Sequence, residues 1–433
     1  MSKAKRQAPT LPKGTRDFYP ESMRLQNFIF DTWKRVSKRF GYEEYEGPIF
    51  EHLELFTGKS GDEIVSQLYH FEDKGNRALA LRPEMTPTLA RLIVQKGNTI
   101  KKPFKWFSIP RLFRYERAQK GRLREFFQLN LDVIGTESVF AEADLISAIV
   151  AMLVEFGLSA DDFSIGISSR ELLANYLIEI GVSDPNLVYP VLDRRLKTSP
   201  EAFLSTLLEL GLLETQVQKI NTFMESKSLN EIRTMISSPN SIQALNDLQN
   251  LFDLIENTGF GPYIGLDLSI VRGLAYYTGI VFEVFDRAKS MRAIAGGGRY
   301  DNLCENLGGQ KVPGVGFGMG DVVLANLLKD HDLIPDLHPK IDLYIASFTN
   351  DFPKVFVLAN QFRELHLNVA HPLEITKLSK QMDQANSQGA RCVVYVDGEK
   401  ATENTYEFKD LSKGLMHIGS IQDIVEHLKN EPS

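Results

Sequence analysis

The stretch FRYERAQKGRLREFFQLNLDVIG, residues 113–135, predicts two β-strands joined by a basic loop that contains a glycine. Polar and apolar residues alternate through the second of these strands. Such alternation places one set of side chains in a core and the other set on the opposite face of a sheet. The apolar set is Phe127, Leu129, Leu131 and Val133, and the polar set is Gln128, Asn130 and Asp132.

The polar face of this predicted hairpin also carries charged groups. In the first strand Arg114 and Glu116 share a face, and further basic residues lie at the rim of the loop. An ionised group that is removed from water without a partner costs several kcal/mol. Two interpretations therefore stay open for this segment: an ordinary solvated sheet face, or a surface that binds a polar ligand.

Length and composition limit the classes of protein to consider. A chain of 433 residues is too long for one compact core and predicts two or three domains. Its net charge of −7 argues against a protein that coats nucleic acid, although local basic patches could still meet RNA. The two cysteines are far apart in sequence, and no apolar run reaches membrane-spanning length. We therefore expect a cytoplasmic protein without disulfides or membrane contact.

Changes of pattern along the chain predict its domains. Residues 1–10 are basic, lack an apolar core and are expected to form a flexible tail. Residues 11–335 mix strands and helices, interrupted at about 185–257 by a leucine-rich segment with helical spacing. Prolines mark a linker before residue 340. Residues 340–433 alternate strand and helix, which is typical of a small α/β domain with a largely parallel sheet.

Two further segments hold candidate ligand-binding residues. LRPEMTPTLARL places Glu84 and Thr86 between a strand and a helix, where they could hold an ammonium group or simply cap the helix. VRGLAYYTG contains Arg272, which could neutralise a phosphate or form a surface ion pair. Tyr276 and Tyr277 follow it. Because consecutive side chains of a strand point to opposite faces, we expect at most one of these tyrosines in a pocket.

Two glycine runs invite a nucleotide-loop interpretation that their spacing does not support. The runs at 296–298 and 314–320 match neither the dinucleotide-binding nor the phosphate-loop pattern. We expect these glycines to let strands or a ligand approach the backbone closely. The eight histidines form no recognisable metal-binding pair, so the sequence identifies no metal ligands among the protein side chains.

Taken in order, five segments resemble those of histidyl-tRNA synthetases, a family of class II aminoacyl-tRNA synthetases. They are LPKGTRDF, LRPEMTP, FRYERAQKGRLREFFQL, VRGLAYYTGIVFE and AGGGRYDNL. RGLAYY discriminates best, because it resembles a signature of this family rather than one shared by all class II enzymes. The similarity runs from residue 11 almost to the C-terminus.

The resemblance implies a fold and a reaction. The fold is a class II core, an antiparallel sheet flanked by helices with a helical insertion, followed by an α/β anticodon-binding domain. The reaction joins histidine and ATP into histidyl-adenylate with release of pyrophosphate, and then transfers the histidyl group to the 3′ end of histidine tRNA. Mg²⁺ is expected as the counter-ion of ATP. The N-terminal helix resembles the family's motif 1, which implies a homodimer.

The resemblance also assigns roles to residues. Arg114 and Arg272 are the expected catalytic residues and face the α-phosphate from two sides. The expected ATP-binding residues are Arg114, Glu116, Arg122 and Arg272. The expected histidine-binding residues are Glu84, Thr86, Gln128, Asp132, Tyr276 and Tyr277, with Asp132 and Tyr277 at the imidazole nitrogens. Arg117 and Gln119 are expected near the acceptor end of the tRNA.

One position departs from the family pattern. Most class II enzymes place an arginine for the γ-phosphate of ATP in the helix after the second glycine run, and this chain has Val323 there. The departure fits either a branch of the family that binds ATP differently or a non-catalytic paralogue. Such a paralogue would regulate histidine biosynthesis or sense uncharged tRNA. Arg114, Arg272 and Glu84 are all retained, which favours the enzyme.

Overall fold

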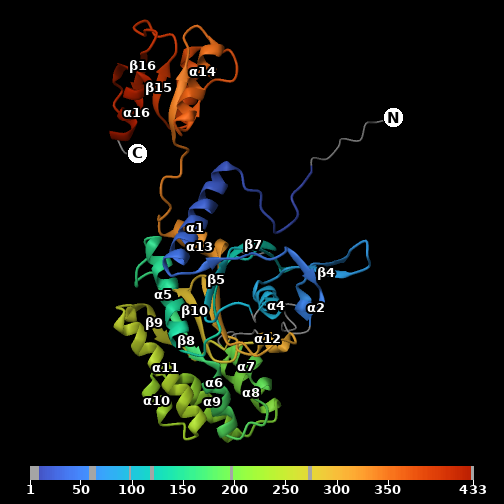
Figure 1. Cartoon of the computed structure of the whole chain (residues 1–433). Helices are drawn as coiled ribbons and strands as arrows, with labels where there is room; N and C mark the ends of the chain where they lie inside the picture. The colour runs from blue at the N-terminus through green and yellow to red at the C-terminus, as the bar shows by residue number, and fades with distance from the viewer. Residues whose placement is uncertain are drawn as a thin grey trace. The chain divides into compact units, whose positions relative to one another are not determined.

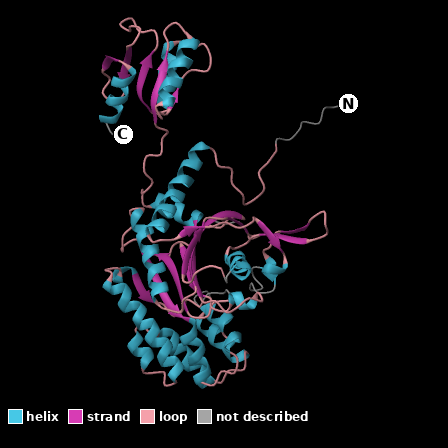
Figure 2. Ribbon diagram, viewed as in Figure 1, coloured by secondary structure: helices cyan, strands magenta, loops and turns pink. Residues whose placement is uncertain are grey.

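The chain divides into two compact units, Met1–Ile334 and Pro335–Ser433 (Figure 1). The computed structural model describes residues 9–57, 65–96, 99–117, 121–195, 198–271 and 276–430. Each unit is built around a main sheet of its own (Figure 2). Within the described residues, no helix is both long enough and apolar enough to cross a membrane.

The first unit is organised by a sheet of nine strands in the order β1-β5-β7-β12-β11-β10-β8-β9, with β6 paired to one end of β7. Every pair from β5 to β8 is antiparallel, whereas the outer pairs β1–β5 and β8–β9 are parallel. The predicted antiparallel core is therefore confirmed, with a parallel strand added at each edge. The strands are β1 (Glu43–Glu44), β5 (Phe104–Ser108), β6 (Arg111–Phe113), β7 (Glu125–Ile134), β8 (Phe163–Ser169), β9 (Ile264–Leu266), β10 (Ile280–Asp286), β11 (Ala295–Arg299) and β12 (Gly314–Gly320).

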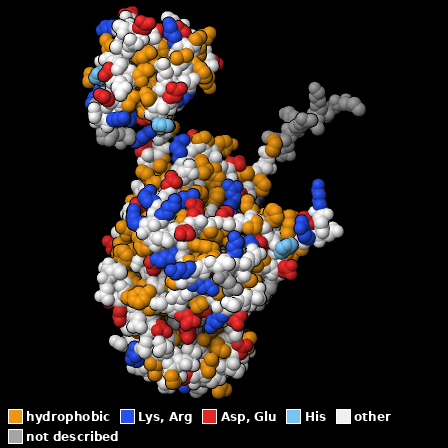
Figure 3. All heavy atoms as spheres, viewed as in Figure 1, with side chains coloured by type: hydrophobic (Ala, Val, Ile, Leu, Met, Phe, Trp, Pro, Cys, Tyr) orange, Lys and Arg blue, Asp and Glu red, His pale blue; other side chains and the backbone are white. Residues whose placement is uncertain are grey.

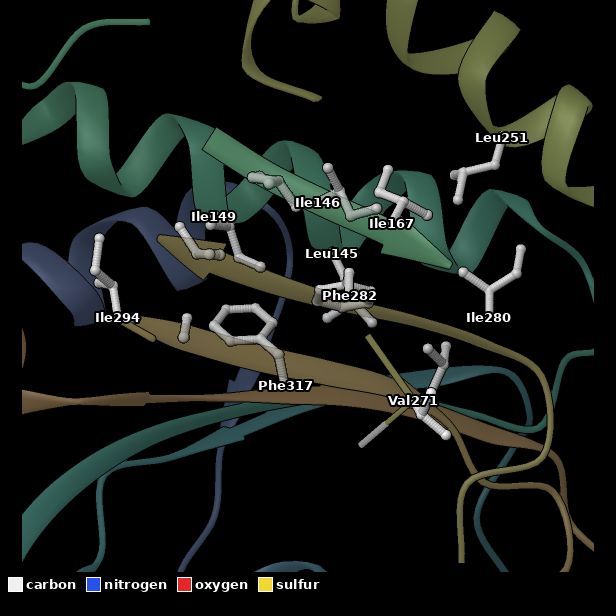
Figure 4. Close-up of a cluster of buried hydrophobic side chains, with 14 of the residues drawn as sticks. Leu145, Ile146, Ile149, Ile167, Leu251, Val271, Ile280, Phe282, Ile294 and Phe317 are labelled. Carbon is white, nitrogen blue, oxygen red and sulfur yellow. The ribbon is translucent and has the colours of Figure 1, made fainter. Parts of the chain in front are cut away.

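Three helices that are far apart in the sequence cover one face of this sheet and complete its hydrophobic core. They are α1 (Pro20–Arg39), α5 (Phe140–Glu155) and α13 (Asp321–Asp330), and their buried side chains belong to the largest hydrophobic cluster. In Figure 4, Leu145 and Ile149 of α5 lie over Phe282 of β10 and Phe317 of β12. Each such side chain contributes about 1.5–3 kcal/mol when it is fully buried, so this layer holds the sheet firmly.

Shorter helices and a second sheet complete the first unit. α4 (Thr86–Lys96) and α12 (Leu303–Asn306) share a separate cluster with Tyr276, Tyr277 and Tyr300. A three-stranded sheet, β2 (Phe50–His52), β4 (Ala78–Leu81) and β3 (His70–Glu72), lies beside α2 (Glu54–Thr57). A helical group appears green to yellow in Figure 1 and comprises α6 (Arg170–Glu179), η1 (Pro185–Leu187), α7 (Tyr189–Asp193), α8 (Pro200–Glu209), α9 (Glu214–Glu225), α10 (Leu229–Arg233), α11 (Pro239–Asn257) and η3 (Gly261–Tyr263).

The predicted hairpin at 113–135 is present, but its first strand is shorter than expected. β6 ends at Phe113, so Arg114 and Glu116 lie beyond the strand rather than on one of its faces. The backbone N–H of Arg114 still donates to the carbonyl of Arg124 at 2.9 Å. The N–H of Glu116 then donates back to the carbonyl of Arg114 at 2.7 Å, a tight turn that stops the strand pairing.

The second unit contains a five-stranded sheet in the order β14-β13-β15-β16-β17. β13 (Ile341–Ala346), β14 (Val369–Ala370) and β15 (Ala390–Tyr395) are parallel, and β16 (Tyr406–Asp410) and β17 (Met416–Gly419) add an antiparallel hairpin. Helices α14 (Phe352–Glu364), α15 (Leu378–Ser387) and α16 (Ile421–Asn430) pack on it. The alternating strands and helices match the predicted α/β pattern. The sheet is mixed rather than largely parallel, because β16 and β17, which the sequence pattern did not reveal, pair in antiparallel fashion.

Candidate active site

A cavity of about 780 Å³ lies against the central strands of the first unit. Its lining comes from β7, β11 and β12, from the chain after β6, and from the segment that precedes β10. The predicted site residues that line it are Glu84, Thr86, Arg114, Glu116, Arg122, Gln128, Asp132, Tyr276 and Tyr277. Arg117 is exposed and is not part of the lining. Arg272 and Gln119 lie outside the described residues.

β7 forms the floor of the cavity, as the alternation in the sequence predicts. Gln128, Asn130 and Asp132 face the cavity, while Leu129 and Leu131 are fully buried in the main core. The polar face is therefore part of a concave site rather than solvated surface, which decides between the two interpretations that the sequence left open.

Two glycines of β12 make room for the polar side chains of β7. A Cβ atom on Gly316 would come within 2.0 Å of the Asp132 Oδ1 atom, and one on Gly318 within 2.7 Å of the Gln128 Cδ atom. Real Cβ atoms do not approach other atoms this closely, so any larger residue must displace these side chains. The glycines serve close approach between strands, which confirms the expectation from their spacing.

Asp132 is held by a tyrosine that sequence reasoning missed. The Tyr300 hydroxyl donates a short hydrogen bond to the Asp132 Oδ1 atom, and both residues are buried. Tyr300 follows directly after β11, whose last residue, Arg299, forms two hydrogen bonds with Glu142 of α5 at 2.6 and 2.7 Å. This buried ion pair fixes the backbone that presents Tyr300. The segment AGGGRYDNL indicated only a family resemblance, and the sequence did not predict that Tyr300 contacts β7.

Burial perturbs the titration of this pair. Loss of water raises the pKa of the Asp132 carboxyl from 3.8 to about 7, and the hydrogen bond from Tyr300 opposes that rise. Burial also raises the pKa of Tyr300 well above its usual value, and the nearby Asp132 charge adds to the effect. Tyr300 therefore remains a neutral donor, whereas Asp132 changes charge close to neutral pH.

The raised pKa of Asp132 predicts that the unliganded protein loses stability as the pH rises. The unfolded chain releases this proton near pH 3.8 and the folded chain near pH 7. Between these values the folded state binds more protons, so the free energy of unfolding falls by about 1.4 kcal/mol per pH unit, about 4 kcal/mol in all. Asp132→Asn removes this contribution. The melting temperature of the variant, measured relative to that of the wild type, should rise from about pH 4 to about pH 8; a constant difference would contradict the assignment.

Glu84 and the two adjacent tyrosines form the next part of the wall. The Tyr276 hydroxyl donates to the Glu84 Oε2 atom at 3.0 Å, and Glu84 is only 4% exposed. Tyr276 and Tyr277 both line the cavity, with ring centroids 5.0 Å apart. The expectation that only one could do so was wrong. β10 begins at Ile280, so the tyrosines precede the strand and do not alternate between its faces.

Arginines line the cavity beside these groups. The Arg114 Nε atom donates to the carbonyl of Pro83 at 2.8 Å, and the guanidinium carbon lies 5.4 Å from the centre of the Phe126 ring. The Arg122 Nε atom forms an ion pair with Glu116, which is itself buried. The Arg114 guanidinium group is thus positioned by backbone and aromatic contacts. It lines the cavity, where it can bind an anionic group.

Two further cations in the cavity wall were missed by the sequence. Val323 lines the cavity, as do Lys289 and Arg292 from the loop between β10 and β11. A Cβ atom on Gly121 would lie 3.7 Å from the Val323 Cγ2 atom and 3.9 Å from the Arg292 Cδ atom. The Arg292 side chain therefore borders the same part of the cavity as the position at which the family pattern has an arginine. Sequence spacing could not show this proximity, because the two residues come from different elements.

The chain is similar to known proteins over most of its length. Residues 14–321 match the family model described as Histidyl-tRNA synthetase. The chain is 41% identical over 416 residues to the chloroplastic/mitochondrial histidine–tRNA ligase of Arabidopsis thaliana. This alignment covers 95% of this chain and 85% of that protein. It is 39% identical over 406 residues to the histidine–tRNA ligase of Opitutus terrae, covering 92% and 93% of the two chains.

A solved structure shows the same likeness in three dimensions. The histidyl-tRNA synthetase of a Nostoc species aligns with a TM-score of 0.81 and 25% identity, covering 97% of this chain and 99% of that one. Sequence and fold therefore agree over nearly the whole length. The chain belongs to the histidyl-tRNA synthetase family.

Proposed function

We propose that the cavity is the site where this chain activates histidine with ATP before transferring it to histidine tRNA. The observation that carries the proposal is the meeting, in one cavity, of two buried carboxylates with tyrosine partners and the arginines of the hairpin. The carboxylate of histidine attacks the α-phosphorus of ATP and pyrophosphate leaves. A hydroxyl at the 3′ end of the tRNA then attacks the histidyl-adenylate carbonyl, and AMP leaves.

The histidine subsite in this proposal uses the residues assigned from the sequence. Asp132 and Tyr277 bind the imidazole nitrogens, with Tyr300 orienting Asp132, while Glu84, Thr86 and Gln128 surround the α-amino group. A buried carboxylate is left without its donor when an apolar side chain replaces the imidazole. Sites built to hydrogen-bond a substrate can reject the analogue lacking that group by about 10⁴–10⁵.

The ATP subsite in this proposal uses the arginines. Arg114 and Arg272 take the charge that develops on the α-phosphate, and Glu116 and Arg122 contact the adenine and the phosphates. Arg292, which borders the same part of the cavity as Val323, provides the cation for the terminal phosphates. Mg²⁺ accompanies ATP as its counter-ion. Glu116 and Glu283 both line the cavity, and carboxylate oxygen is the ligand type that Mg²⁺ prefers, so the residues present fit it.

The tRNA is expected to meet several parts of the chain. We assign Arg117 and Gln119 to the acceptor end, the helical insertion at about 185–257 to the acceptor stem, and residues 340–433 to the anticodon. On the face shown in Figure 3, basic side chains are interspersed with acidic and apolar ones. Such a surface supports recognition through local contacts rather than a general basic field. A cytoplasmic homodimer that pairs through the N-terminal helix belongs to the same proposal.

Aminoacylation of a histidine tRNA transcript with labelled histidine tests this function. We expect stable charging that requires ATP and Mg²⁺, and no charging of a transcript for another amino acid. A folded preparation that binds the tRNA but transfers no histidine would favour the non-catalytic paralogue instead.

A further inference from the structure

The second unit contains a set of metal-ligand side chains that the proposed function does not use. Cys392, Asp410 and His427 each offer one ligand atom, and these atoms all lie within 4.8 Å of one another. Within the described residues this is the one such group of three. The residues are far apart in sequence, which is why the sequence pattern did not indicate them.

The fold brings this set together through a strand pair and a helix. Cys392 of β15 and Asp410 of β16 are register partners in adjacent antiparallel strands, so their side chains share a face. His427 comes from α16, which packs on that face. Cys392 is 1% exposed and Asp410 2% exposed. All three positions are thus set by regular elements rather than by a loop, as a precise ligand site requires.

The hydrogen bonds of Asp410 within its own loop use one of its oxygens, and the other oxygen contacts His427. Its Oδ1 atom accepts from the Ser412 N–H, the Ser412 hydroxyl and the Lys413 N–H at 2.7–3.0 Å. The Asp410 Oδ2 atom lies 3.0 Å from the His427 Nε2 atom.

A second histidine beside the group has an unsatisfied nitrogen. The His417 Nε2 atom is buried and has no hydrogen-bond partner among the described residues. The His417 and His427 rings lie 5.1 Å apart, and His417 also stacks on Phe408. A buried nitrogen without a hydrogen-bond partner destabilises the folded state. A polar ligand that entered the cluster would give it a partner.

We propose that Cys392, Asp410 and His427 bind one Zn²⁺ ion, which fastens α16 to the sheet of the second unit. Thiolate, imidazole and carboxylate form a usual ligand set for this ion. Around a tetrahedral Zn²⁺ the ligand atoms lie about 3.3–3.6 Å apart, so shifts of about 1 Å or less complete the site. Binding removes the thiol proton of Cys392, and the fourth position takes a water that hydrogen-bonds to His417.

The burial of the cluster argues against a different role for the same residues. A cysteine, a histidine and an aspartate can also form a nucleophilic triad. That chemistry requires a substrate to reach the sulfur, and Cys392 is almost completely covered. A metal ion needs only the small shifts described above, so the geometry favours an ion over an organic substrate.

Titration of the chelator-treated full-length protein with Co²⁺ tests the proposal. We expect one equivalent to bind, with tetrahedral d–d bands and a thiolate-to-cobalt charge-transfer band that Zn²⁺ then abolishes. Zn²⁺ should also raise the melting temperature. Loss of even an outer partner of a metal site costs 10–100-fold in affinity, so Cys392→Ser should weaken Zn²⁺ binding by more than about 10²-fold and remove the charge-transfer band.

Two further variants make the result specific. Cys304→Ser changes the other cysteine, which lies buried in α12 of the first unit, and should leave every metal signal as in the wild type. His427→Gln should weaken Zn²⁺ binding by at least about 10-fold and carries the test if Cys392→Ser fails to fold. The proposal fails if wild-type protein shows no charge-transfer band, or if the band survives in Cys392→Ser. These readouts do not depend on tRNA charging.

Discussion

Replacing Arg114 with alanine is expected to slow ATP–pyrophosphate exchange by about 10²–10³, the usual cost of losing one interaction made in the transition state. The guanidinium lines the cavity and is held by the Pro83 carbonyl and the Phe126 ring. Because this charge matters most when negative charge develops on the α-phosphate, kcat should fall far more than the KM for histidine rises. Steady-state exchange at varied histidine and ATP measures both.

A matched control lies three residues earlier on the same hairpin. Arg111 forms an ion pair with Glu125 at 2.7 Å, is about half exposed and does not line the cavity. Arg111→Ala should therefore leave exchange within about two-fold of the wild type, since exposed ion pairs contribute about 0–1 kcal/mol. If both variants lost activity equally, the effect of Arg114→Ala would reflect damage to the hairpin instead of loss of a phosphate contact.

Gly316→Ala is expected to impair histidine activation with little effect on ATP. The new methyl group would come within 2.0 Å of the Asp132 Oδ1 atom and 2.7 Å of the Leu131 carbonyl oxygen, so the carboxylate must move and the pairing of β7 with β12 must adjust. Hydrogen bonds to charged groups contribute about 1.5–3 kcal/mol, and kcat/KM for histidine should fall by about 10–10². The KM for ATP should stay close to the wild-type value. Exchange at saturating concentrations of each substrate in turn separates the two effects.

Two further variants test whether the effect of Gly316→Ala comes from displacement of Asp132. Gly265→Ala adds the same methyl group to β9 of the same sheet, where no atom lies within 4 Å, and should leave exchange unchanged. Tyr300→Phe removes the hydrogen bond to Asp132 without adding volume and should lower kcat/KM for histidine by about 10-fold. A general loss of thermal stability in Gly316→Ala, with a normal Tyr300→Phe, would show that the methyl group disturbs the strand pairing alone.

The sequence predicted the parts of the site that depend on local pattern. The period of two in β7 correctly placed Asp132 and Gln128 on one face and Leu131 in the core. Pattern rules failed where the backbone was not what they assumed. Tyr276 and Tyr277 precede β10 instead of alternating along it, and Arg114 lies beyond the end of β6.

Contacts between distant elements could not be predicted from a single sequence. Tyr300 reaches Asp132 because β11 and β7 both pair with β12. This strand order is set by the tertiary fold and cannot be seen in the local sequence. Arg292 and Val323 border the same part of the cavity although they come from separate elements. In the second unit the missed hairpin β16–β17 brings Asp410 beside Cys392. Each of these residue types was visible in the sequence, but nothing local indicated its partner.

ATP–pyrophosphate exchange with each standard amino acid in turn tests the central claim most directly, because it needs only the cavity and no tRNA. The account predicts rapid exchange with histidine and background exchange with every other amino acid, including those of similar size. Absence of exchange at saturating histidine and ATP, in a preparation that is folded by circular dichroism, would contradict the assignment of this cavity to histidyl-adenylate formation.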